Sequence, residues 1–131
     1  MGVVAASPDI KQGEIFWVDI PPAHTVGSEQ YDRRPYVVVS RTLVNRSGKT
    51  VVGVPLTTAN AMEISQPPYR VVIPARDIIR DVSFQGEIKN SLAKTDHVRV
   101  LAKERLDRRM GKLSDTACAA VVLGLAFLFD R

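Results

Sequence analysis

The 131-residue chain has little cysteine, few aromatic residues and no long hydrophobic run. Its single cysteine, Cys118, excludes an internal disulfide and a zinc site built from several cysteines, and it is typical of a reducing compartment. The longest apolar stretch, residues 117–129, is shorter than the roughly 20 residues that span a bilayer. Residues 1–10 have neither the basic start nor the apolar run of a secretory signal. We therefore expect a cytoplasmic protein without a membrane anchor.

The composition suits one globular domain. The chain is 45% hydrophobic and 24% charged, and its length allows one core rather than two ordinary domains. Pro8 interrupts any helix near the N-terminus, so residues 1–12 are predicted to be a flexible tail and residues 13–131 the domain. The 18 Lys and Arg exceed the 14 Asp and Glu, and the net charge of +4 favours polyanionic partners only weakly.

Short runs of β-branched and aromatic residues, separated by turn residues, predict a mainly β body. The predicted strands are residues 14–20, 35–41, 50–57, 69–74, 82–88 and 92–101. The first of them carries apolar side chains on both faces and is expected to be central in its sheet. Between the second and third strands, Asn45 and Gly48 are expected to supply the positive φ angles of a tight reversal.

The pattern changes near the C-terminus. Helix-forming residues predict a helix over 103–109, and Ser114 with Asp115 is predicted to cap a second helix over 116–129. This last helix is apolar nearly all round, so one face can pack on the sheet while another still needs cover. A second copy of the chain is the simplest cover, which predicts a homodimer.

Two polar segments beside predicted strands are the candidates for a functional site. Residues 24–35 hold serine, glutamate, glutamine and two arginines, and Pro35 fixes the backbone where Arg34 enters the next strand. Residues 52–60 form an apolar strand that ends in Thr57 and Thr58. Taken alone, the first segment is typical of a polar hairpin loop and the second of an ordinary strand end.

Taken together and in this order, the segments resemble the MazF/PemK family of toxin endoribonucleases. The likeness rests on GEIFWVD from Gly13, GSEQ from Gly27, RP at Arg34, VVVS from Val37 and VPLTT from Val54, and it extends over nearly all of residues 13–129. The resemblance implies a small, half-open SH3-like barrel with C-terminal helices, a homodimer, and cleavage of single-stranded RNA at short sequence motifs. It also implies a type II toxin–antitoxin system with an acidic antitoxin of the MazE/PemI kind.

The resemblance assigns Arg34 and Thr57 to the scissile phosphate and Glu29 to the acidic position of the GSEQ motif. The chemistry agrees with this assignment. RNA is cut without a metal when the ribose 2'-hydroxyl attacks its own phosphate, and the negative charge that grows on the phosphate oxygens needs hydrogen-bond donors and positive charge. Arg34 can offer a planar fork of donors, and Thr57 can donate one more hydrogen bond. No cofactor is expected.

The general base stays open between two residues. One candidate is Glu29, provided that burial raises its pKa. The other is His97, because an unperturbed histidine pKa of about 6.5 suits proton transfer near neutrality. The family commonly has glutamine at the position of His97, which favours a contact with the RNA or an ordinary surface histidine over an essential catalyst.

Sequence-selective reading of RNA needs stacking surfaces and hydrogen-bonding edges for unpaired bases. The candidate substrate-binding residues are Ser28, Gln30, Tyr31, Arg33, Thr58, Asp96, His97 and Arg99. Arg33 and Arg99 are expected to contact phosphates, whereas Gln30, Tyr31 and the Asp96–His97 pair are expected to contact bases.

Two other functions remain possible at this point. One is a non-enzymatic toxin that binds DNA gyrase, as the related CcdB toxins do on the same kind of barrel, and the fold alone does not separate it from a nuclease. The context of Arg34 and Thr57 argues against it, because a gyrase-binding protein has no need of a pair that grips a phosphate. The other is an RNA-binding module without catalytic activity.

Overall fold

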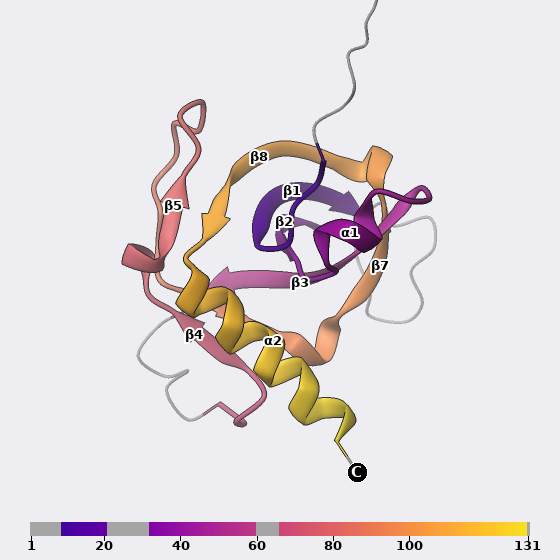
Figure 1. The fold of residues 1–131 in the computed structure, drawn as a ribbon. Coiled ribbons are helices and arrows are strands. Elements are labelled where there is room, and N and C mark those ends of the chain that lie inside the picture. Colours follow the sequence, from indigo (N-terminus) through magenta and orange to yellow (C-terminus); the bar gives the residue numbers. More distant parts are fainter. Residues whose placement is uncertain (1–8, 21–31, 60–65, 131) are drawn as a thin grey trace, which may run out of the picture.

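A single antiparallel sheet, curled into a nearly closed barrel, carries the fold, and one long helix crosses its outer side (Figure 1). The computed structural model describes residues 9–20, 32–59 and 66–130. The strands are β1 (Glu14–Ile20), β2 (Asp32–Val38), β3 (Thr50–Thr58), β4 (Val71–Ile73), β5 (Ile78–Arg80), β6 (Ser91–Ala93), β7 (Arg99–Ala102) and β8 (Leu106–Leu113). The helices are α1 (Thr42–Asn45) and α2 (Asp115–Phe129), and the 3-10 turns are η3 (Ala75–Asp77), η4 (Thr95–His97) and η5 (Lys103–Arg105).

The long strand β3 organises the sheet. The strand order is β4-β6-β3-β2-β1-β8-β5, and β7 also pairs with β3. One edge of β3 pairs with β2, while on its other edge the first half pairs with β7 and the second half with β6. Register shifts between β1 and β8 bend β8 around the barrel. The predicted mainly β barrel with a C-terminal helix is confirmed.

Each face of the sheet has its own hydrophobic core. On the barrel face, the core consists of Val18, Tyr36, Val38, Val51 and Leu101. On the helix face, a larger core packs beneath α2 and includes Ile15, Val37, Val54, Leu56, Ala117 and Val121. Ile15 and Val18 are both fully buried although they point to opposite faces, so the prediction that β1 is central is confirmed.

The reversal between β2 and β3 differs from the prediction. Gly48 has the expected positive φ of 75°, but no described residue other than glycine has a positive φ, so Asn45 does not have the predicted backbone conformation. Asn45 lies instead in α1 with a buried side chain, whose Nδ2 donates to Ile10 O and Ser40 O, both at 2.9 Å. Its amide therefore anchors the chain rather than turning it.

The segment before β1 is part of the folded domain from residue 9 onward. Besides the bond from Asn45 to Ile10, Gln12 Nε2 donates to Val39 O at 2.7 Å and the Gln12 backbone N–H donates to Thr42 Oγ1 at 3.1 Å. Residues 9–12 thus belong with the domain and not with the predicted tail, while residues 1–8 lie outside the described residues.

The predicted strand over 82–88 is wrong, because the strand in this region comes earlier, as β5. After β5, the Asp81 carboxylate accepts hydrogen bonds from the Ser83 backbone N–H at 3.0 Å and the Ser83 hydroxyl at 2.5 Å, and this turn leads into a loop. The predicted strand over 92–101 is split by η4 into β6 and β7. Strand β4 is shorter than predicted, and β2 both begins and ends three residues before the predicted 35–41.

The predicted helix over 103–109 is also wrong. Its first three residues form the single turn η5, and the rest belong to β8, where pairing with β1 overrides the helix propensity of a Lys- and Arg-rich run. The last helix is confirmed, and Ser114 caps it by accepting a hydrogen bond from the Ala117 N–H at 3.1 Å. In the described part of the chain, no helix is long and apolar enough to span a bilayer.

Candidate active site

Arg34 of β2 and Thr57 of β3 lie on the same face of the sheet. The two strands pair with Tyr36 opposite Pro55. Continued by two residues, this register places Arg34 opposite Thr57, and opposed residues of an antiparallel pair point to the same side. Since Tyr36 belongs to the core of the barrel face, Arg34 and Thr57 are both on that face.

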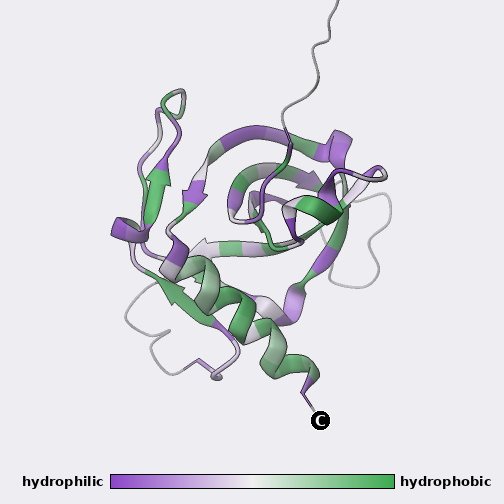
Figure 2. Cartoon of the chain, in the orientation of Figure 1, coloured by the Kyte–Doolittle hydropathy of each residue, from purple (hydrophilic) through white to green (hydrophobic). Residues whose placement is uncertain are grey.

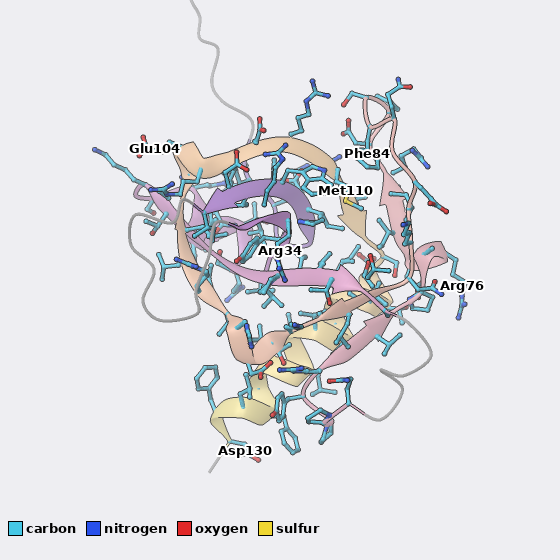
Figure 3. All side chains as sticks on the ribbon, turned by 180° about the vertical axis from the view of Figure 1, so that it is seen from behind. Arg34, Arg76, Phe84, Glu104, Met110 and Asp130 are labelled. Atoms are coloured by element: carbon cyan, nitrogen blue, oxygen red, sulfur yellow. The ribbon has the colours of Figure 1, made fainter. Side chains whose placement is uncertain are left out.

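Thr57 holds a buried hydroxyl at this place. Its Oγ1 is shielded from solvent and has no hydrogen-bond partner within the described residues. A buried hydroxyl without a partner costs about 1–3 kcal/mol, and each such group in a native structure calls for an explanation. Arg34 is half-buried, and Figure 3 shows it beside β3. A guanidinium and a hydroxyl on the same face of neighbouring strands suit an anion with several oxygens, such as a phosphate.

Arg99 adds a second cation to the barrel face. It stands opposite Gly53 in the pairing of β7 with β3, and Gly53 stands opposite Val38 of the barrel core. Arg99 is exposed, at the edge of the same face as Arg34. The structure therefore brings three predicted site residues to one face, namely Arg34, Thr57 and Arg99.

Asp96 and His97 form part of η4, which connects β6 to β7. Both Asp96 carboxylate oxygens accept hydrogen bonds from Arg70, at 2.9 Å from Nε and 2.8 Å from Nη2. These bonds hold the pKa of Asp96 below its usual value. The Nε2 atom of His97 is 3.9 Å from Asp96 Oδ2, and its side chain is 56% exposed. Arg70 therefore fixes η4 in place, while His97 is open to a ligand.

Arg33 and Thr58 point to the helix face, away from Arg34 and Thr57, because neighbouring residues of a strand alternate between faces. Arg33 makes ion pairs with Asp19 at 2.9 Å and Asp107 at 3.2 Å. The hydrogen bond to Asp19, joined by the one to Asp107, raises the pKa of Arg33. Its guanidinium also lies 5.3 Å from the ring centroid of Trp17. Arg33 therefore does not share the face of Arg34 and Thr57.

Four predicted site residues lie in the connection between β1 and β2. They are Ser28, Glu29, Gln30 and Tyr31, and they fall within residues 21–31, outside the described part of the chain. Their assigned roles stay predictions. Over residues 9–20, 32–59 and 66–130, no three His, Cys, Asp or Glu side chains come together in a way that could hold a metal ion.

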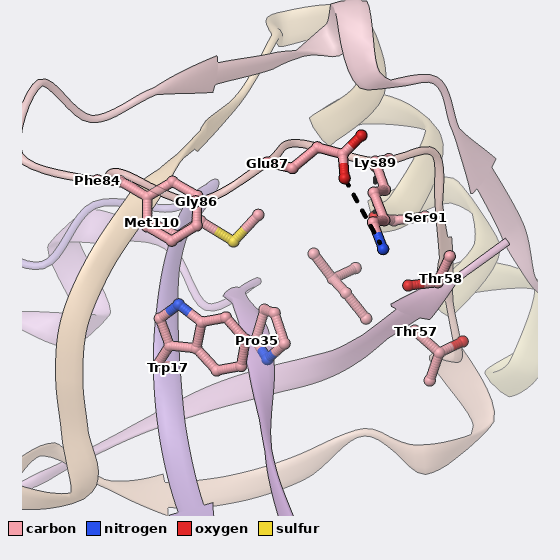
Figure 4. Close-up of a pocket in the computed structure, with 11 residues that line it drawn as sticks. Trp17, Pro35, Thr57, Thr58, Phe84, Gly86, Glu87, Lys89, Ser91 and Met110 are labelled. Carbon is pink, nitrogen blue, oxygen red and sulfur yellow. Dashed lines mark hydrogen bonds and ion pairs between the residues drawn. The ribbon is translucent and has the colours of Figure 1, made fainter.

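A cavity that the sequence did not indicate lies on the helix face, at the end of β3 (Figure 4). We call it the β3 pocket, and its volume is about 460 Å³. Its lining includes Trp17, Thr57, Thr58, Phe84, Lys89, Ser91 and Met110. These residues come from four separate strands and the loop after β5, so no local sequence signal could have grouped them.

The fold is similar to that of several solved toxins. The chain superposes on the crystal structure of MazF from Deinococcus radiodurans with a TM-score of 0.69 and 21% identity, over 95% of this chain and 100% of that one. A MazE–MazF structure from the same organism gives a TM-score of 0.67 with 22% identity, over 93% and 96% of the two chains. A mycobacterial endoribonuclease in complex with its cognate antitoxin gives 0.62 with 19% identity, over 90% and 92%.

Sequence comparison points the same way. The chain is 26% identical over 106 residues to endoribonuclease EndoA of Bacillus subtilis (strain 168), which covers 81% of this chain and 82% of that protein. Residues 11–129 match the family described as PemK-like, MazF-like toxins of type II toxin–antitoxin systems, and not the gyrase-binding toxins that the sequence left as an alternative. The resemblance inferred from the sequence is thereby confirmed, and the chain belongs to the PemK/MazF toxin family.

Proposed function

We propose that the protein is the toxin of a type II toxin–antitoxin system and an endoribonuclease that cuts single-stranded mRNA at short sequence motifs. The family match and the similarity to endoribonuclease EndoA support this function. The observation that carries it is the buried Thr57 hydroxyl, which lacks a partner in the described residues and shares a face with Arg34. We assign a phosphate oxygen of the bound RNA as the acceptor of this hydroxyl.

The reaction transfers the phosphoryl group from the 5'-oxygen of one nucleotide to the 2'-oxygen of the preceding ribose. The ribose 2'-oxygen forms a bond to the adjacent phosphorus, the bond from phosphorus to the 5'-oxygen breaks, and a proton moves from the 2'-hydroxyl to the leaving oxygen through general base and acid. The products are a 2',3'-cyclic phosphate and a 5'-hydroxyl end. Arg34 and Thr57 donate hydrogen bonds to the phosphate oxygens, whose charge grows in the transition state, and each such donor typically contributes about 10²- to 10³-fold in rate.

Two residues compete for the role of general base. Glu29 belongs to the predicted GSEQ motif, and His97 is an exposed imidazole on η4. For Arg99 we propose a contact with a second phosphate of the RNA, a role supported by its exposed position opposite Gly53. Asp96 has both carboxylate oxygens bonded to Arg70, so we assign it chiefly to positioning His97 rather than to reading a base.

An acidic antitoxin is the partner that we propose for the same surface. Solved relatives include a MazE–MazF structure and an endoribonuclease with its cognate antitoxin. A flexible acidic segment can wrap a basic groove and occupy the donors that otherwise grip phosphates. The net charge of +4 and the cationic barrel face are compatible with such a partner.

We also propose a homodimer that acts in the cytoplasm, where mRNA is found. The support for the dimer comes from α2, which Figure 2 shows as hydrophobic along most of its length. One side of it packs on the sheet through Ala117 and Val121, while Leu123 is 72% exposed and Phe127 57% exposed. A second copy would bury these side chains.

Cleavage of a long single-stranded RNA in EDTA, with mapping of the new ends, tests the proposed activity. Discrete cuts with 5'-hydroxyl ends are expected, and the rate should fall at least about 100-fold in Arg34→Ala and in Thr57→Val. The matched controls are Arg108→Ala, an exposed arginine of β8, and Thr50→Val, an exposed threonine at the other end of β3. Intact RNA, a requirement for Mg²⁺, or equal losses in the controls would refute the proposal.

A further inference from the structure

We propose that the β3 pocket binds one unpaired base of the RNA, that of a nucleotide next to the scissile phosphate, and so contributes to the choice of cleavage site. This inference rests on the proposed nuclease function, because it needs a phosphate at Arg34 and Thr57. The argument comes from the two sides of the pocket and from its position on β3.

One side of the pocket is aromatic and held rigid. Trp17 has the Arg33 guanidinium 5.3 Å from its ring centroid, and the ion pairs of Arg33 fix that contact. Phe84 has the Arg80 guanidinium 5.6 Å from its ring centroid. Arg80 Nη1 also donates to Phe84 O at 3.0 Å and Gly86 O at 2.5 Å, which holds the loop in shape. Rigid aromatic surfaces are stacking platforms for unpaired bases.

The other side of the pocket offers hydrogen-bonding groups (Figure 4). Thr58 and Ser91 are directly opposite in the pairing of β3 with β6, so both hydroxyls are on the pocket side. Lys89 Nζ lies 3.9 Å from Glu87, which is longer than a hydrogen bond, and both side chains are exposed. Hydroxyl, ammonium and carboxylate groups together can donate to and accept from the edge of a base.

The position of the pocket links it to the catalytic pair. Thr57 and Thr58 are the last two residues of β3 and point to opposite faces of the sheet. A phosphate held at Thr57 therefore lies where the strand ends. Thr57 and Thr58 both contribute to the pocket lining, so a nucleotide next to this phosphate can place its base in the pocket.

An apolar side chain from an antitoxin is the other occupant to consider. It would fill the aromatic side of the pocket, but it would offer no hydrogen bond to the Thr58 hydroxyl and would desolvate the loose ion pair of Lys89 with Glu87. The Ser91 hydroxyl already donates to Lys89 O at 3.0 Å and would keep that bond. Burying polar groups without partners is unfavourable. A base satisfies both sides, since its faces stack and its edge forms hydrogen bonds.

Trp17 gives a direct test, because it is the only tryptophan in the chain. The full-length protein is titrated with short single-stranded DNAs, each made of one kind of base, and with an oligomer of abasic residues. These oligomers stay intact because DNA lacks the 2'-hydroxyl. At least one base-containing oligomer should quench Trp17 emission and the abasic one should not. Phe84→Ala and Lys89→Met should weaken this binding about tenfold, whereas Val82→Ala, a fully exposed residue of the same loop, should leave it unchanged.

Mapping of cut sites provides the second readout. In Phe84→Ala, the base preference at one position beside the scissile phosphate should relax while the other positions keep theirs. Equal affinity for abasic and base-containing oligomers, or wild-type binding in both variants, would refute base binding in the β3 pocket. If only an acidic peptide with apolar side chains quenches Trp17 emission, base binding is refuted and the pocket is a site for a protein partner. Quenching by bases in a protein that leaves RNA intact would refute the proposed nuclease and retain the base site.

Discussion

Arg33 and Arg34 are consecutive in β2, yet they serve opposite faces of the sheet. Arg33 stands opposite Asp19 and bonds to it at 2.9 Å beside Trp17, whereas Arg34 stands opposite the buried Val18 on the barrel face. The same alternation holds in β3, where Thr57 lies on the barrel face and Thr58 on the helix face, although both residues contribute to the lining of the β3 pocket. Two strand ends thus supply one face with Arg34 and Thr57 and a second face with different side chains.

Replacing Thr57 by valine should remove activity without lowering stability. Because its Oγ1 is buried and no described group bonds to it, exchange of the hydroxyl for a methyl group of similar size should leave the free energy of unfolding unchanged or raise it by up to about 1 kcal/mol. Urea denaturation measures this quantity. The control is Thr95→Val, since Thr95 is fully buried and its hydroxyl donates to Tyr69 O, so that its loss should cost about 1–3 kcal/mol. A destabilised Thr57→Val would mean that the hydroxyl serves the fold.

Parts of this architecture follow from the sequence, and the reasons differ from element to element. The limits of β1 match because apolar side chains alternate on both of its faces, and α2 matches because Ser114 caps an apolar run. These signals are local. The strand β8 could not be predicted, since helix-forming residues dominate its sequence and only pairing with β1 makes it a strand.

The candidate site, too, could be predicted only where the signal is local in the sequence. Arg34 and Thr57 could be named from their motifs, but their common face depends on the β2–β3 register, which no local pattern fixes. Arg33 lies beside Arg34 in sequence and on the other face in space, so proximity along the chain did not put the two arginines on one face. The β3 pocket depends on residues as far apart as Trp17 and Met110.

The ion pair between Arg70 and Asp96 should make part of the stability depend on pH. The pKa of Asp96 is lowered, first by the hydrogen bonds from Arg70, so the pair stabilises the fold fully above the unfolded-state pKa of about 3.9 and less as pH falls through the lower pKa of the folded state. Asp96→Asn should therefore cost about 1 kcal/mol at pH 7, the upper end for a partly exposed pair. In urea denaturation from pH 7 to pH 3, the difference from wild type should shrink below about pH 4.

A second ion pair supplies the control for this measurement. Arg46 contacts Asp9 at 2.8 Å through a single nitrogen, and both side chains are more exposed than those of Arg70 and Asp96. Asp9→Asn should change the free energy of unfolding by less than about 0.5 kcal/mol. A difference for Asp96→Asn that stays constant down to pH 3 would show that the carboxylate charge is not what stabilises η4.

Gly124 allows α2 to approach the sheet closely. A Cβ atom at this position would lie 2.5 Å from Tyr69 O and 3.2 Å from Val71 Cγ2. At an exposed helix position, Gly→Ala stabilises by up to about 1 kcal/mol, but here the added methyl group should push α2 away and cost about 1–3 kcal/mol. Thermal denaturation of Gly124→Ala shows whether the change stabilises or destabilises the fold. A raised melting temperature would contradict the close packing of α2 on η4 and β4.

The exposed apolar side of α2 leads to the last prediction, which concerns assembly. If a second copy covers Leu123 and Phe127, light scattering at micromolar concentration should give twice the chain mass of 14.4 kDa for the wild type. Leu123→Glu and Phe127→Glu should each shift the mass towards one chain, because a carboxylate buried at the interface would have to be desolvated without a partner. Leu43→Glu is the matched control, since Leu43 is 65% exposed on α1 and should keep the wild-type mass. A wild type of 14.4 kDa, or an equal effect of Leu43→Glu, would remove the argument that α2 forms the interface.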